Sequence, residues 1–151
     1  MPQSLSAVCV HAVFSTKNRL PLLHDAAVRT EMHRYLAGIS NRLDCPALEV
    51  GGVADHVHVL AYLGRSISQA DWVKELKRAS AIWLKKFAPQ VEHFAWQAGY
   101  GLFSVSASQT AKARQYIANQ EAHHQKVGFQ DELRTLLQVH GLEWSEEYLW
   151  E

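Results

Sequence analysis

An alternating run at residues 55–60, Asp-His-Val-His-Val-Leu, constrains the fold more than any other part of the chain. In a β-strand successive side chains point to opposite faces, so His56 and His58 share one face while Val57 and Val59 share the other. The valines require an apolar layer against them. The histidines form an incomplete divalent-metal site on the other face, which needs at least one further ligand.

Hydrophobic periodicity along the chain predicts strands and helices in a definite order. Asp25 and Ser68 are placed to cap the first two helices, and Pro89 stops the second. The pair Gly51-Gly52 predicts a bulge or turn just before the histidine strand. The expected elements are strands at residues 8–15, 47–53, 56–63 and 102–107, and helices at residues 25–43, 68–87, 109–125 and 131–140.

The first six of these elements follow the order of an α+β, ferredoxin-like (RRM-like) β-α-β-β-α-β sandwich. In that fold a four-stranded antiparallel sheet carries both helices on one face and leaves the other face open. If Val57 and Val59 lie under the helices, the histidines stand on the open face, where the helix at 109–125 becomes the extra element. We expect one domain over residues 1–151, with its core at about 6–127 and a C-terminal helix and tail at 128–151.

Composition narrows the class of protein. With 48% hydrophobic and 20% charged residues the chain is typical of soluble globular proteins. It has neither a run long enough for a membrane helix nor the pattern of a signal peptide, so we expect a cytoplasmic protein without membrane association. Its 15 basic residues are balanced by 15 acidic ones, so any nucleic-acid surface must arise from segregation of charge.

The third helix carries a second group of chemically capable residues. Tyr116 and Gln120 are four positions apart and share a helical face, and His123 and His124 continue near it. A phenol beside a divalent metal can act as a covalent nucleophile on phosphorus. Taken singly, Tyr116 fits an ordinary packing tyrosine better and Gln120 a solvated amide, so the functional hypothesis depends on their joint arrangement with the histidines.

Several segments resemble one protein family. GGVADHVHVL contains the His-hydrophobic-His motif, and YIANQEAHH contains the tyrosine and glutamine of the third helix. HAVFSTKNRLPLL, VKELKRASAIWLKK and WQAGYGLFSVSAS add to the likeness, which extends over most of the chain. Together they are similar to the single-tyrosine HUH transposases of IS200-like insertion sequences and their REP-associated relatives.

The resemblance implies a specific chemistry. His56 and His58 would bind Mg²⁺ or Mn²⁺, and Gln120 would be the third protein ligand. Tyr116 would attack single-stranded DNA, leaving a 5′-phosphotyrosine link and a free 3′-hydroxyl. The resemblance also implies a homodimer that recognises DNA with hairpin ends, in which the tyrosine helix serves its own or its partner's histidines.

Other residues are candidates for supporting roles. His123 and His124 are candidates for contacts that support the metal ligands. Basic residues gather on one face of the second helix, in the loop after the first strand and at the start of the third helix, where they could follow phosphates. The candidate DNA-binding residues are Lys17, Arg19, Lys74, Lys77, Arg78, Lys85, Lys112 and Arg114.

Alternative functions remain open at this point. A histidine-triad nucleotide hydrolase would need a third histidine at position 60, which is Leu60, and a metallo-β-lactamase-type hydrolase would need an Asp-His that is absent. An HUH nickase of plasmid replication or conjugation would share the tyrosine chemistry. A domesticated or non-catalytic module that binds single-stranded nucleic acid would keep its binding without the metal and the phenol.

Overall fold

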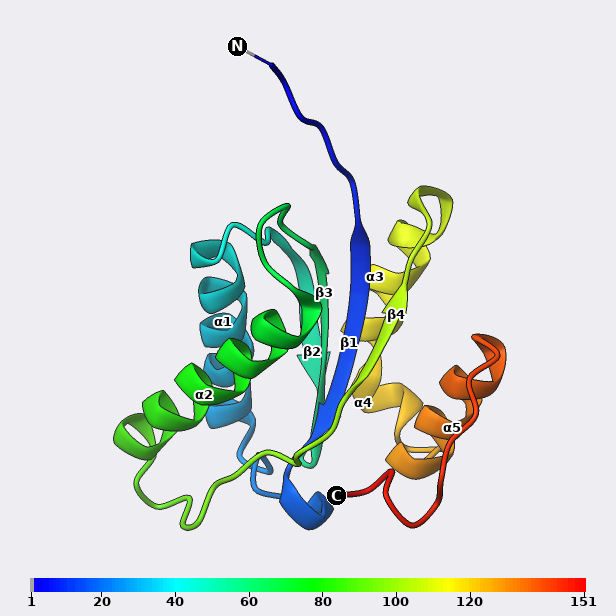
Figure 1. Cartoon of the computed structure of the whole chain (residues 1–151). Coiled ribbons are helices and arrows are strands. Elements are labelled where there is room, and N and C mark those ends of the chain that lie inside the picture. Colours follow the sequence, from blue (N-terminus) through cyan, green and yellow to red (C-terminus); the bar gives the residue numbers. More distant parts are fainter. Residues whose placement is uncertain (1) are drawn as a thin grey trace.

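A four-stranded antiparallel sheet forms the centre of the computed structural model, which describes residues 2–151 (Figure 1). In spatial order the strands are β2 (Ala47–Gly52), β3 (His56–Tyr62), β1 (Cys9–Ser15) and β4 (Gly101–Ser104). Each neighbouring pair runs antiparallel. The predicted α+β, ferredoxin-like architecture is confirmed.

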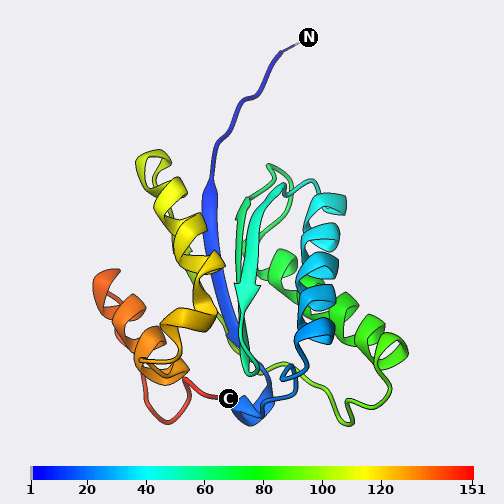
Figure 2. The ribbon, with the colours of Figure 1, turned by 180° about the vertical axis from the view of Figure 1, so that it is seen from behind.

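Two long helices cover one face of this sheet (Figures 1 and 2). They are α1 (Ala26–Arg42), which follows the short 3-10 turn η1 (Lys17–Arg19), and α2 (Gln69–Phe87). Asp25 and Ser68 accept hydrogen bonds from backbone N–H groups in the first turns of α1 and α2, as predicted. Within the described residues, no helix has both the length and the apolar character needed to cross a membrane.

The main apolar core lies between the sheet and these two helices. Val57 and Val59 are fully buried in it, as the alternation of β3 predicts. Burial of a large apolar side chain contributes about 1.5–3 kcal/mol each, so this layer supplies much of the folding free energy. Its largest fully buried members are Phe14, Leu23, Met32, Leu36, Trp72, Leu76 and Leu84.

Three helices follow β4 on the opposite face. The turn η2 (Ala107–Gln109) leads into α3 (Thr110–Ala118), and α4 (Gln120–His123) and α5 (Phe129–Val139) come after it. The prediction of one continuous helix at 109–125 was wrong, because the helix breaks at Asn119, where φ is −98° and ψ is 22°. Asparagine is unfavourable inside helices because its side chain competes for backbone hydrogen bonds.

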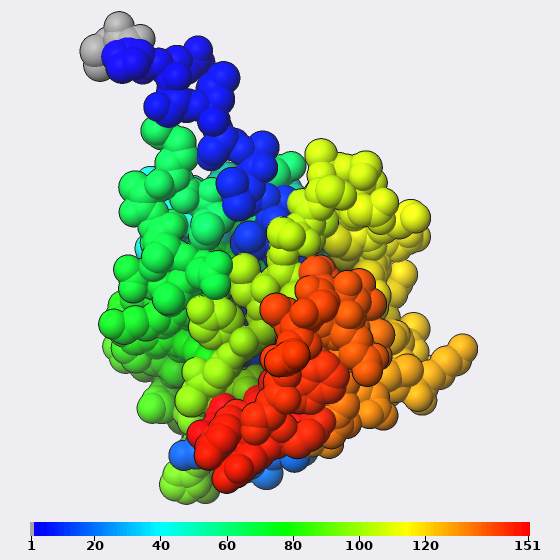
Figure 3. Space-filling view, turned by 45° about the vertical axis from the view of Figure 1, so that its right-hand side comes forward, coloured from blue at the N-terminus to red at the C-terminus, as the bar shows by residue number. Residues whose placement is uncertain are grey.

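A second, smaller core holds α5 against the sheet. The space-filling view shows α5 and the C-terminal residues lying directly against the β4 side of the molecule (Figure 3). The helix ends as predicted at Gly141, whose φ of 68° falls in the left-handed region that glycine favours. The buried residues of this core are Val13, Phe103, Phe129, Leu133 and Leu137.

Close backbone contact seats α3 on the sheet. A Cβ atom on Gly51 would lie 2.3 Å from the carbonyl oxygen of Ile117. Of the predicted bulge or turn at the glycine pair, the bulge was wrong: Gly51 pairs in register with His58, and the irregularity lies between Ala47 and Glu49. Gly52 does end β2, directly before the short connection to β3. The missing side chain of Gly51 therefore serves the approach of α3 to β2.

We expect Gly51→Ala to lower the free energy of unfolding by about 1–3 kcal/mol, because the backbone of α3 must move to admit the methyl group. Urea denaturation of the purified chain measures this change. Gly99→Ala is a suitable control, since a Cβ at Gly99 would meet its nearest atoms only at 3.8 Å, an ordinary van der Waals contact. A Gly51→Ala protein as stable as the control would contradict the close contact.

Candidate active site

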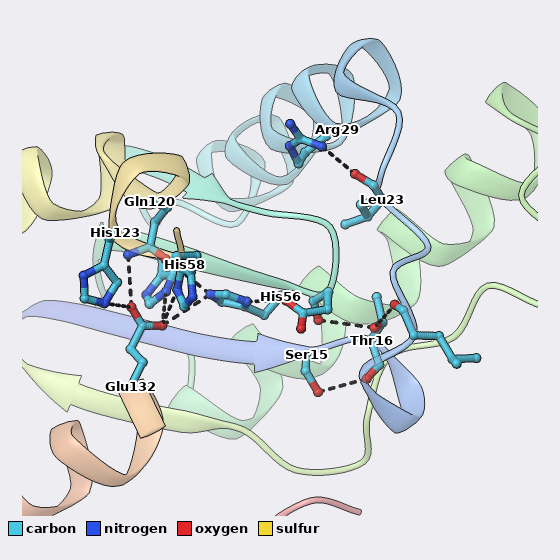
Figure 4. A network of polar contacts seen from close by, with 12 residues as sticks. Ser15, Thr16, Leu23, Arg29, His56, His58, Gln120, His123 and Glu132 are labelled. Atoms are coloured by element: carbon cyan, nitrogen blue, oxygen red, sulfur yellow. Dashed lines mark hydrogen bonds and ion pairs between the residues drawn. The ribbon is translucent and has the colours of Figure 1, made fainter. Parts of the chain in front are cut away.

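His56 and His58 stand on the sheet face opposite the main core. Both are fully buried, and their rings lie beneath α3 to α5 (Figure 4). The Nδ1 atom of His56 lies 2.7 Å from Oδ1 of Asp55. Burial lowers the pKa of His56, but the carboxylates of Asp55 and Glu132 raise it more, so that the pKa is raised overall. Asp55 is thus positioned to orient His56 through its outer nitrogen.

A third histidine, His11 on the neighbouring strand β1, lies within hydrogen-bond distance of His58. Its Nε2 atom lies 2.7 Å from Nδ1 of His58, and the two rings stack with their centroids 5.0 Å apart. Burial lowers the pKa of His11 to about 3 and that of His58 to about 4. Both rings are therefore neutral near pH 7, and one N–H is shared in the hydrogen bond between them.

Glu132 of α5 lies at the centre of the site, and sequence reasoning missed it. Its Oε1 atom is 2.9 Å from Nε2 of His58, 3.3 Å from Nε2 of His56 and 3.2 Å from Nε2 of His124. The residue is only 3% exposed. Burial raises the pKa of this carboxyl, but the imidazoles of His124, His56 and His58 lower it far more, so Glu132 is ionised.

The sequence did contain a signal for Glu132. Phe129, Leu133 and Leu137 form the apolar stripe of α5 at four-residue steps. Glu132 is buried among these positions, and a charged residue on a buried helical face requires partners. That mismatch identifies a functional candidate without any structure.

Tyr116 of α3 reaches the other oxygen of this carboxylate. Its hydroxyl donates a hydrogen bond to Oε2 of Glu132, and its ring meets that of His58 edge-on with 5.8 Å between centroids. Burial, and then the neighbouring negative charge, raise the pKa of Tyr116 above its ordinary value. The phenol is therefore protonated near neutral pH, with an acceptor already in place for its proton.

Gln120 of α4 contacts both His56 and Glu132. It is buried, its Oε1 atom lies 3.2 Å from Nε2 of His56, and its Nε2 donates to Oε2 of Glu132 at 3.2 Å. The break at Asn119 precedes this residue. The structure thus brings together His56, His58, Tyr116 and Gln120, which were predicted from two separate segments.

The remaining histidines of the third-helix segment also enter the site. Nε2 of His123 lies 3.1 Å from Oε2 of Glu132, and His124 approaches Oε1. Within residues 2–151, Nε2 of His124 is buried without a hydrogen-bond partner of good geometry. Ligand atoms of His56, His58, His124 and Glu132 all lie within 4.8 Å of one another, so this buried cluster could hold a divalent metal ion.

The predicted DNA-binding residues do not gather at this site. Lys74, Lys77, Arg78 and Lys85 line a groove of about 470 Å³ on α2, which lies on the opposite face of the sheet from α3. The ammonium group of Lys77 donates to the backbone carbonyls of Gln97, Ala98 and Gly99. Burial lowers the pKa of Lys77 to about 8. A role in DNA contact stays a prediction for all four.

The other basic candidates lie on α3 and η1. Lys112 and Arg114 are exposed on α3, and Arg114 is 3.7 Å from Glu49. Lys17 is exposed in η1, and Arg19 lies over the ring of Trp150. These positions leave the side chains of Lys17 and Lys112 accessible to a phosphate backbone.

Comparisons with known proteins identify the family of the chain. Residues 4–120 match the family described as "Transposase IS200 like". No curated protein matches the chain. A crystal structure described as a candidate transposase of Deinococcus radiodurans R1 is 25% identical, with a TM-score of 0.62 over 80% of this chain and 95% of that one.

A second solved structure shares the fold at lower identity. It is a REP-associated tyrosine transposase bound to a REP hairpin, 13% identical, with a TM-score of 0.58 over 84% of this chain and 74% of that one. The family match spans most of the chain and includes His56, His58, Tyr116 and Gln120. The chain therefore belongs to the IS200-like transposase family.

Proposed function

We propose that this protein is a metal-dependent transposase that cuts and rejoins single-stranded DNA through a 5′-phosphotyrosine intermediate, with Tyr116 as the nucleophile. One observation supports this most strongly. The hydroxyl of Tyr116, the Nε2 atom of His58 and the amide of Gln120 all contact the carboxylate of Glu132. A nucleophile and potential metal ligands thus converge at one point.

The residues suit a divalent metal. Imidazole nitrogens suit transition ions and an amide oxygen suits Mg²⁺ or Mn²⁺. We propose His56, His58 and Gln120 as ligands, and Mg²⁺ or Mn²⁺ as the ion because the family resemblance implies it. The Nδ1 atoms of the two histidines face Asp55 and His11, which leaves both Nε2 atoms directed into the cluster. When bound, such an ion polarises the scissile phosphate and stabilises the charge that develops on it.

The chain's own groups account for the covalent step. The phenolic oxygen of Tyr116 attacks phosphorus, the bond from phosphorus to the 3′-oxygen breaks, and that oxygen leaves as a free 3′-hydroxyl. Oε2 of Glu132 accepts the hydrogen bond of the phenol and so orients the attacking oxygen, and the proton that the phenol loses is balanced by the one that the departing 3′-oxygen takes up. Rejoining is the reverse: a 3′-hydroxyl attacks the phosphotyrosine and releases Tyr116.

The proposed substrate is single-stranded DNA with hairpin ends, bound by a homodimer. The REP-associated relative was solved with a hairpin, which supports a hairpin partner for this family member. Within one chain, Tyr116 and His58 both contact Glu132, which supports an active site formed inside each subunit. Exposed Lys17 and Lys112 are candidates to follow the phosphates.

A direct test is to incubate the protein with Mn²⁺ and hairpin-bearing single-stranded DNA labelled at its 3′ end. That label stays with the strand that the 5′-phosphotyrosine link retains. We expect a covalent adduct on denaturing gels, its loss when EDTA removes the metal, and attachment of the nucleotide to Tyr116 in mass spectra of the digested adduct. A binding module without catalysis would shift the DNA on native gels and give no adduct.

A further inference from the structure

Glu132 reaches the site from α5, a helix outside the family match. Residues 121–151 lie beyond the matched segment, yet α5 places a buried carboxylate beside the histidines of β3. Phe129 and Leu133 anchor α5 in the second core. Figure 4 shows the side chain of Glu132 extending from α5 to the rings. The residues on either side of Glu132 thus anchor the helix that carries it.

The spacing of the polar atoms around Glu132 resembles a coordination sphere. Two ligand atoms in neighbouring positions of an octahedral ion with bonds of about 2.1 Å are roughly 3 Å apart. Oε1 of Glu132 lies 2.9, 3.3 and 3.2 Å from Nε2 of His58, His56 and His124. These separations match the edges of such a sphere.

The hydrogen-bond pattern leaves ring nitrogens available for an ion. Nδ1 of His56 faces Asp55, and Nδ1 of His58 faces His11, so the Nε2 atom of each ring points toward Glu132. Nε2 of His124 is buried and has no well-aligned hydrogen-bond partner among the described residues. Three nitrogens directed at one oxygen are more than a carboxylate oxygen, with its two lone pairs, can pair with good geometry.

We propose that Glu132 is itself a ligand of the metal ion, so that the ion lies between β3 and α5 and is held by His56, His58 and a carboxylate. His124 is the neighbouring imidazole that can add to this set. The inference rests on the proposed function for the use of the metal, and it extends the ligand set beyond Gln120. Imidazoles with one carboxylate favour Mn²⁺ over Mg²⁺, because nitrogen ligands suit transition ions better.

Calorimetric titration of the metal-free full chain with Mn²⁺, in the absence of DNA, tests this inference. We expect Glu132→Gln to weaken Mn²⁺ binding by at least about 10-fold, because the amide replaces an anionic ligand with a neutral one. Glu143→Gln, at an exposed position, is the matched control and should bind Mn²⁺ as the wild type does. Wild-type affinity in Glu132→Gln would overturn the inference.

A second measurement decides the question if Glu132→Gln does not fold. Anomalous scattering from Mn²⁺ soaked into crystals of the wild-type chain locates the ion. A Glu132 oxygen at about 2.2 Å from the ion supports the inference, whereas an ion held by His56, His58 and Gln120 with Glu132 turned away overturns it.

The outcome is separable from that of the proposed function. If the wild type forms the adduct but Glu132→Gln binds Mn²⁺ as tightly as the wild type does, only the assignment of Glu132 as a ligand is refuted. If Glu132→Gln binds Mn²⁺ more weakly but the wild type forms no adduct, only the proposed reaction is refuted.

Discussion

Tyr116→Phe should abolish the covalent protein–DNA adduct while leaving the protein folded. Phenylalanine keeps the ring beside His58 and His123 but has no oxygen to bond with phosphorus. Loss of the hydrogen bond to Glu132 should lower the free energy of unfolding by about 1–3 kcal/mol. Denaturing gels with 3′-labelled hairpin DNA and Mn²⁺ measure the adduct, and urea denaturation measures the stability.

Tyr148→Phe provides the matched control for this substitution. Tyr148 is 62% exposed, so removal of its hydroxyl should change neither the adduct nor the stability appreciably. Hairpin binding on native gels should be similar in both variants, because neither changes a basic residue. An adduct that persists in Tyr116→Phe would show that another residue is the nucleophile.

His58→Ala should reduce DNA cleavage by at least about 100-fold, because it removes a proposed metal ligand from the point where Tyr116 meets Glu132. Its Nε2 is 2.9 Å from Glu132, and its Nδ1 holds His11, so the substitution disturbs the site on both sides. Initial rates of adduct formation at saturating Mn²⁺ give the cleavage loss, and circular dichroism checks the fold.

Binding distinguishes a chemical role of His58 from a structural one. Hairpin affinity should change by no more than about two-fold, because phosphate contacts from lysine and arginine side chains dominate such affinity. His24→Ala, at an exposed position before α1, is the control and should cleave as the wild type does. Loss of both binding and cleavage in His58→Ala would assign the histidine to the scaffold.

Local sequence signals predicted the sheet and the helices well. The alternation of β3 placed Val57 and Val59 in the main core and the histidines on the other face, because a strand has only these two directions for its side chains. Asp25 and Ser68 marked helix starts through their short polar side chains. The Gly51 contact could not be predicted, since it depends on where α3 crosses β2.

The site was predicted only as far as spacing within single elements allows. Two histidines two apart in a strand, and Tyr116 and Gln120 four apart in a helix, each identify a shared face. The approach of His11 to His58 comes from strand pairing, and that of Glu132, 74 residues beyond His58, comes from the packing of α5. The apolar stripe of α5 marks Glu132 as a candidate, but its periodicity does not say which side chains the carboxylate meets.

The two faces of β3 separate the demands of folding from those of chemistry. Val57 and Val59 face the α1 and α2 layer, whereas His56 and His58 contact Gln120 and Glu132 on the helices of the opposite side. Apolar residues under α1 and α2 can therefore be exchanged for others of similar volume over evolutionary time without a side-chain contact to the imidazoles. The 7 residues of β3 thus allow substitutions that change the stability of the core while the positions of the two imidazoles stay the same.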